Sequence, residues 1–446
     1  MNRIAAVVAG LSLASVGTSA TYAATHTVCP SGCDYTSIQD AISASVDHDV
    51  ITIAPGIFHE HRLDLGGKAI TIQGTRDSNG ALATTIDAGQ HDDVFEIHSG
   101  EGNDTVIKDL MITGCGVTGI YTFNSSPIII GCQITGNTSW DVGGGIQCDG
   151  TGATQIIDCT ITDNTALKGG GIMCRQPDAV IRGCVITGNT ASEGFGGGIY
   201  CGEGHPTITD CTITDNTAHH GGGGIFLFED NSSSISHCTI SGNTSRGEGL
   251  FPGGGGIYIF PRGTPAILDC TISDNTTNRG SGGGLYVYIS AKPTITSCTI
   301  TGNHAPHGSG GGIYCDVDSQ PTVIGGTISG NSPHGIFRAH ESSRGDAPDV
   351  GHVILEDAMV CGNGNATSVL QVAGMFMHFG ETRIANDCDP GTDTGDLDED
   401  GDVDTDDLSA LHSVLGVCTH DTNHDGITGI DDLLDVIEGW DQSCTP

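Results

Sequence analysis

The sequence predicts an all-β protein that closes as a parallel β-helix of about 11–12 coils, followed by a small α-helical module that binds calcium. Three observations predict this organisation. A pattern of Ile, Asn, Gly and Cys recurs about every 25 to 32 residues from near Leu110 onward. The segments between Gly and Asn are short, rich in Thr, Ile and Val, and lack a helical period. Two acidic twelve-residue loops follow near the C-terminus.

Composition and charge favour a repeat architecture over a single round core. The 446 residues include 70 glycines and only 5% aromatic residues, which is unusual for a globular enzyme of this size. Asp and Glu number 54 against 15 Lys and Arg, giving a formal net charge of −39. Because such a chain repels phosphate backbones, the charge argues against nucleic acid as a partner and favours divalent cations.

The N-terminus has the organisation of a secretion signal. Arg3 precedes an apolar run from Ile4 to Gly17, and small residues follow up to Ala23. This run is too short to span a bilayer, and no later segment is a candidate for a span. We therefore predict a cleaved signal peptide over residues 1–23 and a secreted, extracellular or cell-surface protein. The 18 cysteines all follow it, in a compartment where disulfides can persist.

The first coil of a β-helix needs a cover, because its strand edges and apolar side chains would otherwise be open to solvent. Residues 35–45 predict a short amphipathic helix with Thr36 or Ser37 as its N-cap, just before a strand at 50–53. Cys29 and Cys33 are expected to close a small disulfide loop beside this cap.

Each repeat predicts about three short strands. In the segment 207–216, Cys211 and Ile213 share a strand parity that Ile208 does not, so a bend must separate them if all three face inward. The Gly-Gly-Gly-Ile segment supplies the third strand. A coil of this length without a helix can close only as a parallel β-helix, which we place at residues 25–386.

Cysteines fill two columns of the repeat. In the second column Cys exchanges with Leu, Ile and Val, which indicates a small buried apolar position rather than a metal ligand or an obligatory disulfide partner. Cross-linking between some of these cysteines remains an alternative. The first column is Cys132, Cys159, Cys184, Cys211, Cys238, Cys270, Cys298 and Gly326; the second is Cys148, Cys174, Cys201, Leu227, Ile259, Val287 and Cys315.

A third column consists of asparagine and predicts a ladder at a turn. Asn tolerates left-handed backbone geometry, and stacked amides satisfy one another's donors and acceptors from coil to coil. Sugar binding by these amides is the alternative interpretation. The column is Asn137, Asn164, Asn189, Asn216, Asn243, Asn275, Asn303 and Asn331.

The repeat resembles that of two known groups of proteins. Cys211-Thr-Ile-Thr-Asp-Asn216, followed by Gly222-Gly-Gly-Ile225, is similar to the paired repeats of the polymorphic outer-membrane proteins and of the pectin-lyase-like superfamily. The resemblance implies a right-handed, single-stranded parallel β-helix. It also implies two classes of function, adhesion at a cell surface or cleavage of polysaccharides.

The acidic tail, residues 387–446, carries calcium-loop spacing twice. Oxygen donors stand at positions 1, 3, 5 and 12 of each loop, glycine stands at position 6, and a backbone carbonyl at position 7 completes the shell. Segments 408–415 and 433–440 are predicted exit helices. The expected ligands of two Ca²⁺ ions are Asp396, Asp398, Asp400, Asp402 and Asp407, then Asp421, Asn423, Asp425, Ile427 and Asp432.

Asp at position 12 and the absence of entering helices make this tail similar to a type I dockerin. That resemblance implies calcium-dependent folding and attachment to a cohesin-type scaffold or a cell-surface component. The pairs Thr405-Asp406 and Ile430-Asp431 stand where dockerins choose partners and are not the Ser-Thr pair, so the resemblance leaves the cohesin open. A disordered acidic tail is the alternative.

Variable loops form two side columns in which a functional site is expected. The column after the Asn ladder holds cations and aromatics suited to an anionic glycan. Its members are Trp140, Asp141, Lys168, Glu193, His219, His220, Arg246, Arg279, His304 and His307. The column after the Gly-Ile strand could supply lyase or hydrolase carboxylates and a base. Its members are Arg175, Glu203, His205, Glu229, Asp230, Arg262, Lys292, Asp316 and Asp318.

The sequence thus supports two functions. The first is a non-catalytic β-helix protein that binds glycan or a cell surface. The second is a polysaccharide lyase or glycoside hydrolase, although neither enzyme's catalytic motif is recognisable. Ordinary solvated turns also collect polar residues, so both loop columns have a purely structural interpretation as well.

Overall fold

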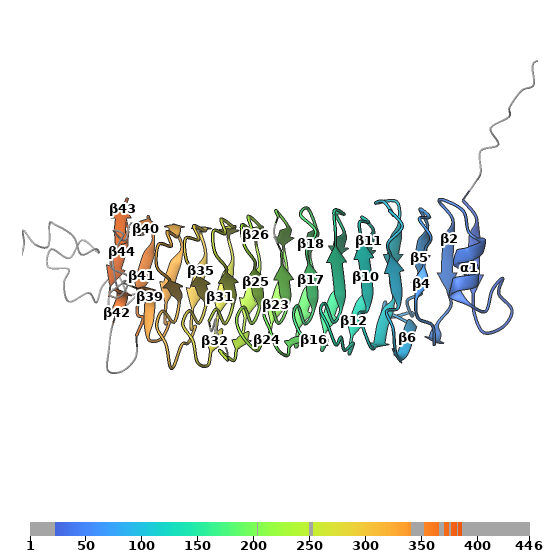
Figure 1. Ribbon diagram of the computed structural model, residues 1–446, viewed down its shortest axis with the longest axis horizontal. Helices are drawn as coiled ribbons and strands as arrows, with labels where there is room; N and C mark the ends of the chain where they lie inside the picture. The colour runs from blue at the N-terminus through green and yellow to red at the C-terminus, as the bar shows by residue number, and fades with distance from the viewer. Residues whose placement is uncertain are drawn as a thin grey trace, which may run out of the picture.

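The computed structural model describes residues 23–202, 204–248, 253–339, 352–364, 370–373, 376–380 and 382–385. These residues form an all-β parallel solenoid of about 12 turns, drawn out as a straight rod (Figure 1). The predicted signal peptide, apart from its last residue, and the predicted calcium module lie outside the described residues. None of the helices in the described part of the chain is a candidate for crossing a membrane.

Three long parallel sheets run the length of the described solenoid, with one strand per coil in each. The 14-stranded sheet contains β1 (Thr25–Val28), β2 (Val50–Ile53), β5 (Thr71–Gln73), β8 (Val106–Lys108), β11 (Ile128–Ile130), β14 (Gln155–Ile157), β18 (Val180–Arg182), β22 (Thr207–Thr209), β26 (Ser234–Ser236), β30 (Ala266–Leu268), β34 (Thr294–Thr296), β37 (Thr322–Ile324), β40 (Val353–Glu356) and β43 (Phe376–Phe379).

The second sheet follows the first after a tight corner in most coils. This 13-stranded sheet contains β3 (Gly56–Phe58), β6 (Thr84–His91), β9 (Met111–Cys115), β12 (Gln133–Thr135), β15 (Thr160–Thr162), β19 (Val185–Thr187), β23 (Thr212–Thr214), β27 (Thr239–Ser241), β31 (Thr271–Ser273), β35 (Thr299–Thr301), β38 (Thr327–Ser329), β41 (Met359–Cys361) and β44 (Arg383–Ala385).

The third sheet is formed by the Gly-Gly-Gly-Ile segments and their equivalents. This 12-stranded sheet contains β4 (Leu63–Asp64), β7 (Phe95–Ile97), β10 (Ile120–Phe123), β13 (Ile146–Asp149), β17 (Ile172–Cys174), β21 (Ile199–Cys201), β25 (Ile225–Leu227), β29 (Ile257–Ile259), β33 (Leu285–Val287), β36 (Ile313–Cys315), β39 (His334–Arg338) and β42 (Leu370–Ala373).

Five central coils add a fourth strand of two residues, which was not predicted from the sequence. These strands pair as a short sheet directly after the Asn ladder: β16 (Thr165–Ala166), β20 (Thr190–Ala191), β24 (Thr217–Ala218), β28 (Thr244–Ser245) and β32 (Thr276–Thr277). The prediction of about three strands per coil is confirmed for the long sheets.

The bend predicted from side-chain parity lies at Asp210. Its backbone has φ +56°, a left-handed conformation that Asp adopts more readily than most residues. This corner reverses the alternation between β22 and β23, so Ile208, Cys211 and Ile213 are all buried in the core. Equivalent left-handed corners at Asp158 and Asp269 repeat the device in other coils.

The asparagine column forms the predicted ladder. Asn216 donates both its backbone N–H and its Nδ2 to Oδ1 of Asn243, at 3.0 Å each. Asn243 in turn donates its Nδ2 to the carbonyl of Ile213 at 2.8 Å. All eight predicted members are fully buried, and Asn363 extends the ladder by one further coil.

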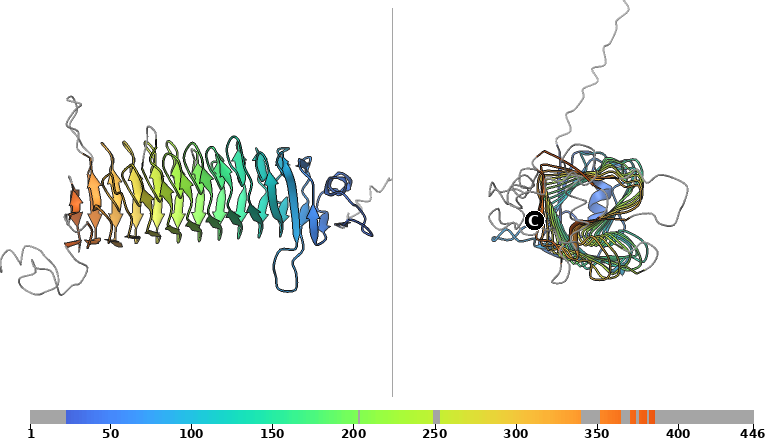
Figure 2. Two further views of the ribbon diagram at one scale, coloured as in Figure 1. Left: turned by 90° about the horizontal axis from the view of Figure 1, so that it is seen from below. Right: turned by 90° about the vertical axis from the view of Figure 1, so that its left-hand side faces the viewer.

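Both cysteine columns face the core, as predicted. Twelve cysteines of the described coils are free thiols and buried, and thiols of the first column hydrogen-bond to carbonyl oxygens of their own coil or the preceding one. The predicted disulfide between Cys29 and Cys33 is present. The predicted cap is α1 (Ile38–Ala44), which has Ser37 as its N-cap and covers the N-terminal end of the solenoid (Figure 2).

Candidate functional site

The outer face of the 12-stranded sheet carries an unusual row of side chains. In the three-residue strands of this sheet from β17 to β36, the first and third residues face the core, and the residue between them belongs to this outer row. Strand register aligns the row from coil to coil. Its members are Gln147, Met173, Tyr200, Phe226, Tyr258, Tyr286, Tyr314 and Phe337.

Aromatic rings stack along this row because neighbouring strands hold them in register. The ring centroids of Tyr258 and Tyr286 are 4.7 Å apart and their planes differ by 6°. A second row stands beside the first, in which the centroids of Phe260 and Tyr288 are 5.2 Å apart and that of Phe228 lies 5.7 Å from Phe260. An aromatic strip therefore runs parallel to the solenoid axis on this side of the sheet, and within it Phe226 and Tyr258 are buried.

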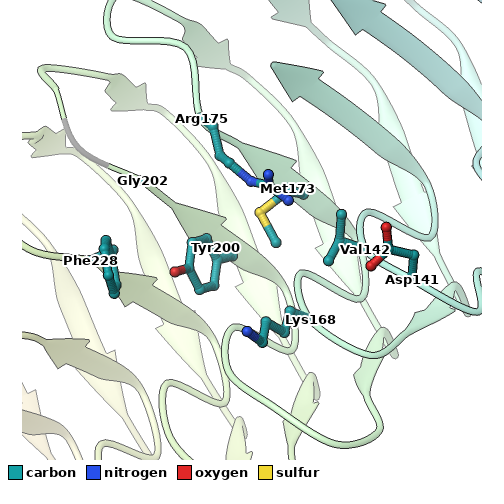
Figure 3. Close-up of a pocket in the computed structure, with 8 residues that line it drawn as sticks. All are labelled: Asp141, Val142, Lys168, Met173, Arg175, Tyr200, Gly202 and Phe228. Carbon is teal, nitrogen blue, oxygen red and sulfur yellow. The ribbon is translucent and has the colours of Figure 1, made fainter. Parts of the chain in front are cut away.

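A cavity of about 540 Å³ lies beside the N-terminal end of this strip. Met173, Tyr200 and Phe228 line it with apolar and aromatic surface, and charged side chains reach it from both sides of the strands (Figure 3). Lys168 comes from the loop before β17, whereas Arg175 directly follows that strand. The full lining is Asp141, Val142, Lys168, Met173, Arg175, Tyr200, Gly202 and Phe228.

The structure thus brings together members of both predicted loop columns. Asp141 and Lys168 belong to the column after the Asn ladder, and Arg175 belongs to the column after the Gly-Ile strand. The two columns flank the same strand, so the narrow outer face of β17 separates the cations. Nε of Arg175 lies 3.5 Å from Oδ1 of Asp149, which fixes one side of the guanidinium while its side chain remains 47% exposed.

The tyrosines of the strip remain protonated at neutral pH. Burial raises the pKa of Tyr200 to about 12 and that of Tyr314 to about 12, and it raises the pKa of Tyr286 further. Tyr200 can therefore present a phenol O–H to a ligand in the cavity. The carboxyl of Asp316 accepts a hydrogen bond from the hydroxyl of Tyr286 at 3.1 Å, and burial raises the pKa of Asp316 above its usual range.

The remaining residues of the loop column after the Asn ladder occupy exposed or half-buried positions. Trp140 is 71% exposed and precedes Asp141 at the cavity. His219 places Nε2 3.1 Å from Oε2 of Glu248, and His220 hydrogen-bonds to the carbonyl of Glu248. The structure leaves the other members on the surface away from the cavity: Glu193, Arg246, Arg279, His304 and His307.

The residues of the loop column after the Gly-Ile strand do not form a single site within the described residues. Arg262 pairs with Asp230 through two hydrogen bonds of 2.9 and 3.1 Å, and its Nη2 lies 3.9 Å from Oε2 of Glu229. His205, Lys292 and Asp318 occupy separate turns, and none lines the cavity. Glu203 and all ten predicted calcium ligands lie outside the described residues.

The aromatic and apolar floor of the cavity was not predicted from the sequence. Met173 and Tyr200 line the cavity and occupy the variable position of the Gly-Gly-Gly-Ile-x-Cys pattern, where an outward residue would ordinarily be polar. Phe226 occupies the same position in the next coil. A run of large apolar residues at an outward position is the signal that could have identified this face. Phe228 lies two residues further along, on the same side of the sheet.

The comparison with known protein families matches the central coils. Residues 144–325 and 248–346 match the family model described as the right handed beta helix region. No curated protein matches the amino-acid sequence. The match supports the handedness that the sequence resemblance implied for these coils.

Solved structures with a similar course of the chain come from several proteins. A double mutant of the periplasmic alginate epimerase AlgG is 14% identical, with 76% of this chain and 77% of that chain covered and a TM-score of 0.47. The catalytic unit of a GH87 alpha-1,3-glucanase from Streptomyces thermodiastaticus is 14% identical, with 77% and 64% covered and a TM-score of 0.35. Pectate lyase Pel9A is 12% identical, with 84% and 82% covered and a TM-score of 0.34. The family model alone identifies residues 144–346 as a right-handed β-helix region.

Proposed function

We propose that this chain is a secreted β-helix protein that binds an acidic polysaccharide in the cavity between Lys168 and Arg175. The observation that carries the proposal is the combination of two cations and an aromatic floor in one cavity of a chain whose formal net charge is −39. The chain has only 15 Lys and Arg residues, and two of them line this cavity. A ligand that pairs with both must carry more than one negative charge.

The shape of the site favours a sugar chain over a compact anion. Tyr200 and Phe228 offer ring surfaces on which pyranose rings can stack, while the cations at the two sides can pair with carboxylates that project from such a chain. Trp140, which precedes the cavity residue Asp141 in the chain, is a further exposed aromatic residue. Beyond the cavity, Phe226 and Tyr258 are buried and closed to a ligand. The rings of Phe228, Phe260 and Tyr288 are half-buried, so an extended polymer can follow the rod over this second row.

Isothermal titration calorimetry with oligosaccharides of uronic acids tests this proposal. Lys168→Gln and Arg175→Gln should each weaken binding about tenfold, or about 1.4 kcal/mol, because each removes one charged contact. Added salt should weaken binding of the wild type more than that of either variant. A neutral oligosaccharide of equal length should bind weakly to all three proteins.

Arg182→Gln provides the matched control. Arg182 is an exposed arginine of β18, on the outer face of the 14-stranded sheet and outside the cavity lining. Its substitution removes the same charge from the protein and should leave the affinity unchanged. Equal losses in all three variants would show that net charge, rather than this cavity, determines binding, and would reject the proposed site.

Cleavage of the bound polymer is a second candidate function, favoured by the carboxyl of Asp141 in the same cavity as Lys168 and Arg175. In a β-elimination, a base removes the proton next to the carboxylate, the glycosidic C–O bond breaks, and the departing oxygen gains a proton while a C=C bond forms. Absorbance of the unsaturated product ends, or release of reducing ends, detects cleavage. A chain that binds without producing either is a binding protein.

We also propose that the tail binds two Ca²⁺ ions and attaches the rod to a cohesin-type or cell-surface partner. The support is the ligand spacing repeated in loops 396–407 and 421–432. Calcium titration of the full chain should give two sites per molecule and a gain in helical circular dichroism, because ion binding supplies folding energy that a small module lacks.

Two variants locate those ions. Asp396→Asn together with Asp421→Asn should abolish high-affinity binding, since both remove the first ligand of a loop. Asp393→Asn removes an acidic side chain just outside the first loop and should retain both sites. Calcium uptake that is unchanged in the double variant would contradict the assignment.

A further inference from the structure

The outer face of the 13-stranded sheet carries two ranks of small side chains over seven consecutive coils, from β15 to β38, and every member except Val185 has a hydroxyl group. Buried Ile residues separate the ranks, and strand register aligns each rank from coil to coil. We call this surface the hydroxyl face. Its first rank is Thr160, Val185, Thr212, Thr239, Thr271, Thr299 and Thr327; its second rank is Thr162, Thr187, Thr214, Ser241, Ser273, Thr301 and Ser329.

The composition of the hydroxyl face is not explained by strand propensity alone. Thr is favoured in strands, but exposed strand faces of an ordinary soluble protein also carry Lys, Arg and Glu. None of these side chains appears in either rank, in a chain of which 15% is charged. Acidic side chains such as Asp163, Asp215 and Asp274 stand instead at the corners after the second rank.

The geometry of the hydroxyl face is periodic in two directions. Neighbouring strands of a sheet lie about 4.8 Å apart, and alternate residues of one strand lie about 6.6 Å apart. The coils superpose closely when the rod is viewed end-on, so the strands of the sheet stay aligned along the rod (Figure 2). Thr has a restricted χ1 angle, which favours one repeated orientation of its hydroxyl and methyl groups.

A surface that repeats in two dimensions is complementary to a ligand that does the same. Hexagonal ice presents oxygen atoms with one repeat close to the spacing between strands and a second repeat somewhat longer than the spacing along a strand, and it is uncharged, as the ranks are. Methyl groups exclude liquid water while hydroxyl groups hydrogen-bond to ordered water, so such a face can hold a layer of water in ice-like positions. A disordered or branched polymer has no matching repeat.

We propose that the hydroxyl face adsorbs to ice and slows the growth of ice crystals. This activity is separate from glycan binding, because the face lies on the 13-stranded sheet and the cavity lies on the 12-stranded sheet. The first rank provides the outermost contacts, since Thr212, Thr239, Thr271 and Thr299 are exposed. In the second rank, Thr214 donates a hydrogen bond to Thr187 at 3.1 Å, which links adjacent coils.

Microscopy of ice recrystallisation with the full chain tests this inference. The wild type should keep ice crystals small at concentrations at which albumin has no effect. Thr239→Tyr together with Thr271→Tyr should raise the required concentration at least tenfold, because bulky rings lift the face from a flat lattice. The pair Thr239→Lys and Thr271→Lys should do the same through charge and bulk.

Thr207→Tyr together with Thr294→Tyr is the matched control on the outer face of the 14-stranded sheet, where Arg182, Leu268 and Ile324 interrupt the ranks. This pair should retain full activity, and circular dichroism should show the wild-type fold in every variant used. If ice crystals grow in a solution of the wild-type protein as fast as they do in a solution of albumin, the proposal is overturned. Equal losses from the control pair and the Thr239 and Thr271 pair would also overturn it, because they would exclude the hydroxyl face as the contact.

Discussion

At the scale of single residues, Asp93 is the most perturbed carboxyl group of the described coils. It lies just before β7, is only 8% exposed, and its Oδ1 has no hydrogen-bond partner. Burial raises its pKa to about 7, with smaller increases from Glu96 and Asp92, while the backbone of Thr118 opposes the shift. The folded protein therefore holds a proton on this group at mildly acidic pH.

We expect Asp93 to make stability depend on pH. The folded pKa exceeds the usual 3.8, so the folded state binds the extra proton, and the unfolding free energy falls as pH rises from about 4 to about 7. Above pH 7 the unfolding free energy stays lower than at pH 4, by about 4 kcal/mol for a pKa shift of this size. In denaturant titrations from pH 4 to pH 8, the unfolding free energy of Asp93→Asn should therefore increase relative to that of the wild type as the pH rises.

Asp104→Asn is the control for Asp93, because Asp104 is an exposed carboxyl in a neighbouring turn. Its substitution should leave the pH profile of the wild type unchanged. If Asp93→Asn shows a stability difference that is constant between pH 4 and pH 8, the carboxyl does not titrate as described.

At the same scale, some site residues could be predicted and others could not. Lys168 and Arg175 stand out in sequence because cations are rare in this chain. That both side chains line one cavity, on opposite sides of β17, depends on the directions of side chains from two variable loops. The repeat does not determine these directions. The aromatic floor was missed because a periodic outward position was expected to be polar, and Tyr200 and its equivalents break that rule.

At the scale of elements, the Asn ladder joins coils through side chains as well as through strands. Asn243 accepts two hydrogen bonds from Asn216 and donates one to the carbonyl of Ile213. All of these groups are buried, so water cannot replace a lost partner. The ladder therefore determines where each coil turns and which coils are adjacent.

Asn243→Ala should destabilise the central coils by several kcal/mol, since each buried group left without a partner costs about 1–3 kcal/mol. Hydrogen exchange should accelerate most at Asn216 and in the two adjacent coils, because a solenoid contacts only its neighbours. Asn278→Ala, at an exposed position in the following coil, should change stability by less than about 0.5 kcal/mol. Comparable effects of the two substitutions would contradict a structural role for the ladder.

The corners after the 13-stranded sheet show a second rule, an alternation of Asp and Gly. Oδ1 of Asp215 would lie 2.5 Å from a Cβ added at Gly242, and Oδ1 of Asp274 would lie 2.4 Å from one at Gly302. Each carboxylate thus occupies space above a glycine of the next coil. The alternation also separates carboxylates by two coils, which reduces repulsion between like charges in an acidic protein.

At the scale of the whole molecule, most of the fold was predictable because stacking converts a one-dimensional repeat into buried columns. The columns of Cys211 and Asn216 predicted which side chains face inward, and parity predicted the corner that separates Ile208 from Cys211. The short fourth strand at Thr217–Ala218 was not predictable, because its hydrogen bonds depend on how closely adjacent loops follow the ladder.

The whole molecule separates its surfaces by sheet. The 12-stranded sheet presents an aromatic strip and the cavity, whereas the 13-stranded sheet presents small hydroxyl side chains. A rod of this kind can display two flat surfaces that function independently, because substitutions on one sheet do not contact the other. Glycan binding and ice adsorption should therefore be separable by the variants described for each.

The central claim is that an acidic polysaccharide binds along the solenoid axis over Met173 and Tyr200. A crystal structure of the full chain with a bound oligosaccharide of uronic acids tests this claim most directly. We expect sugar density in the cavity, with carboxylates against Lys168 and Arg175 and a ring stacked on Tyr200. Density on another face, or an empty cavity at a ligand concentration that saturates the protein in solution, would contradict the account.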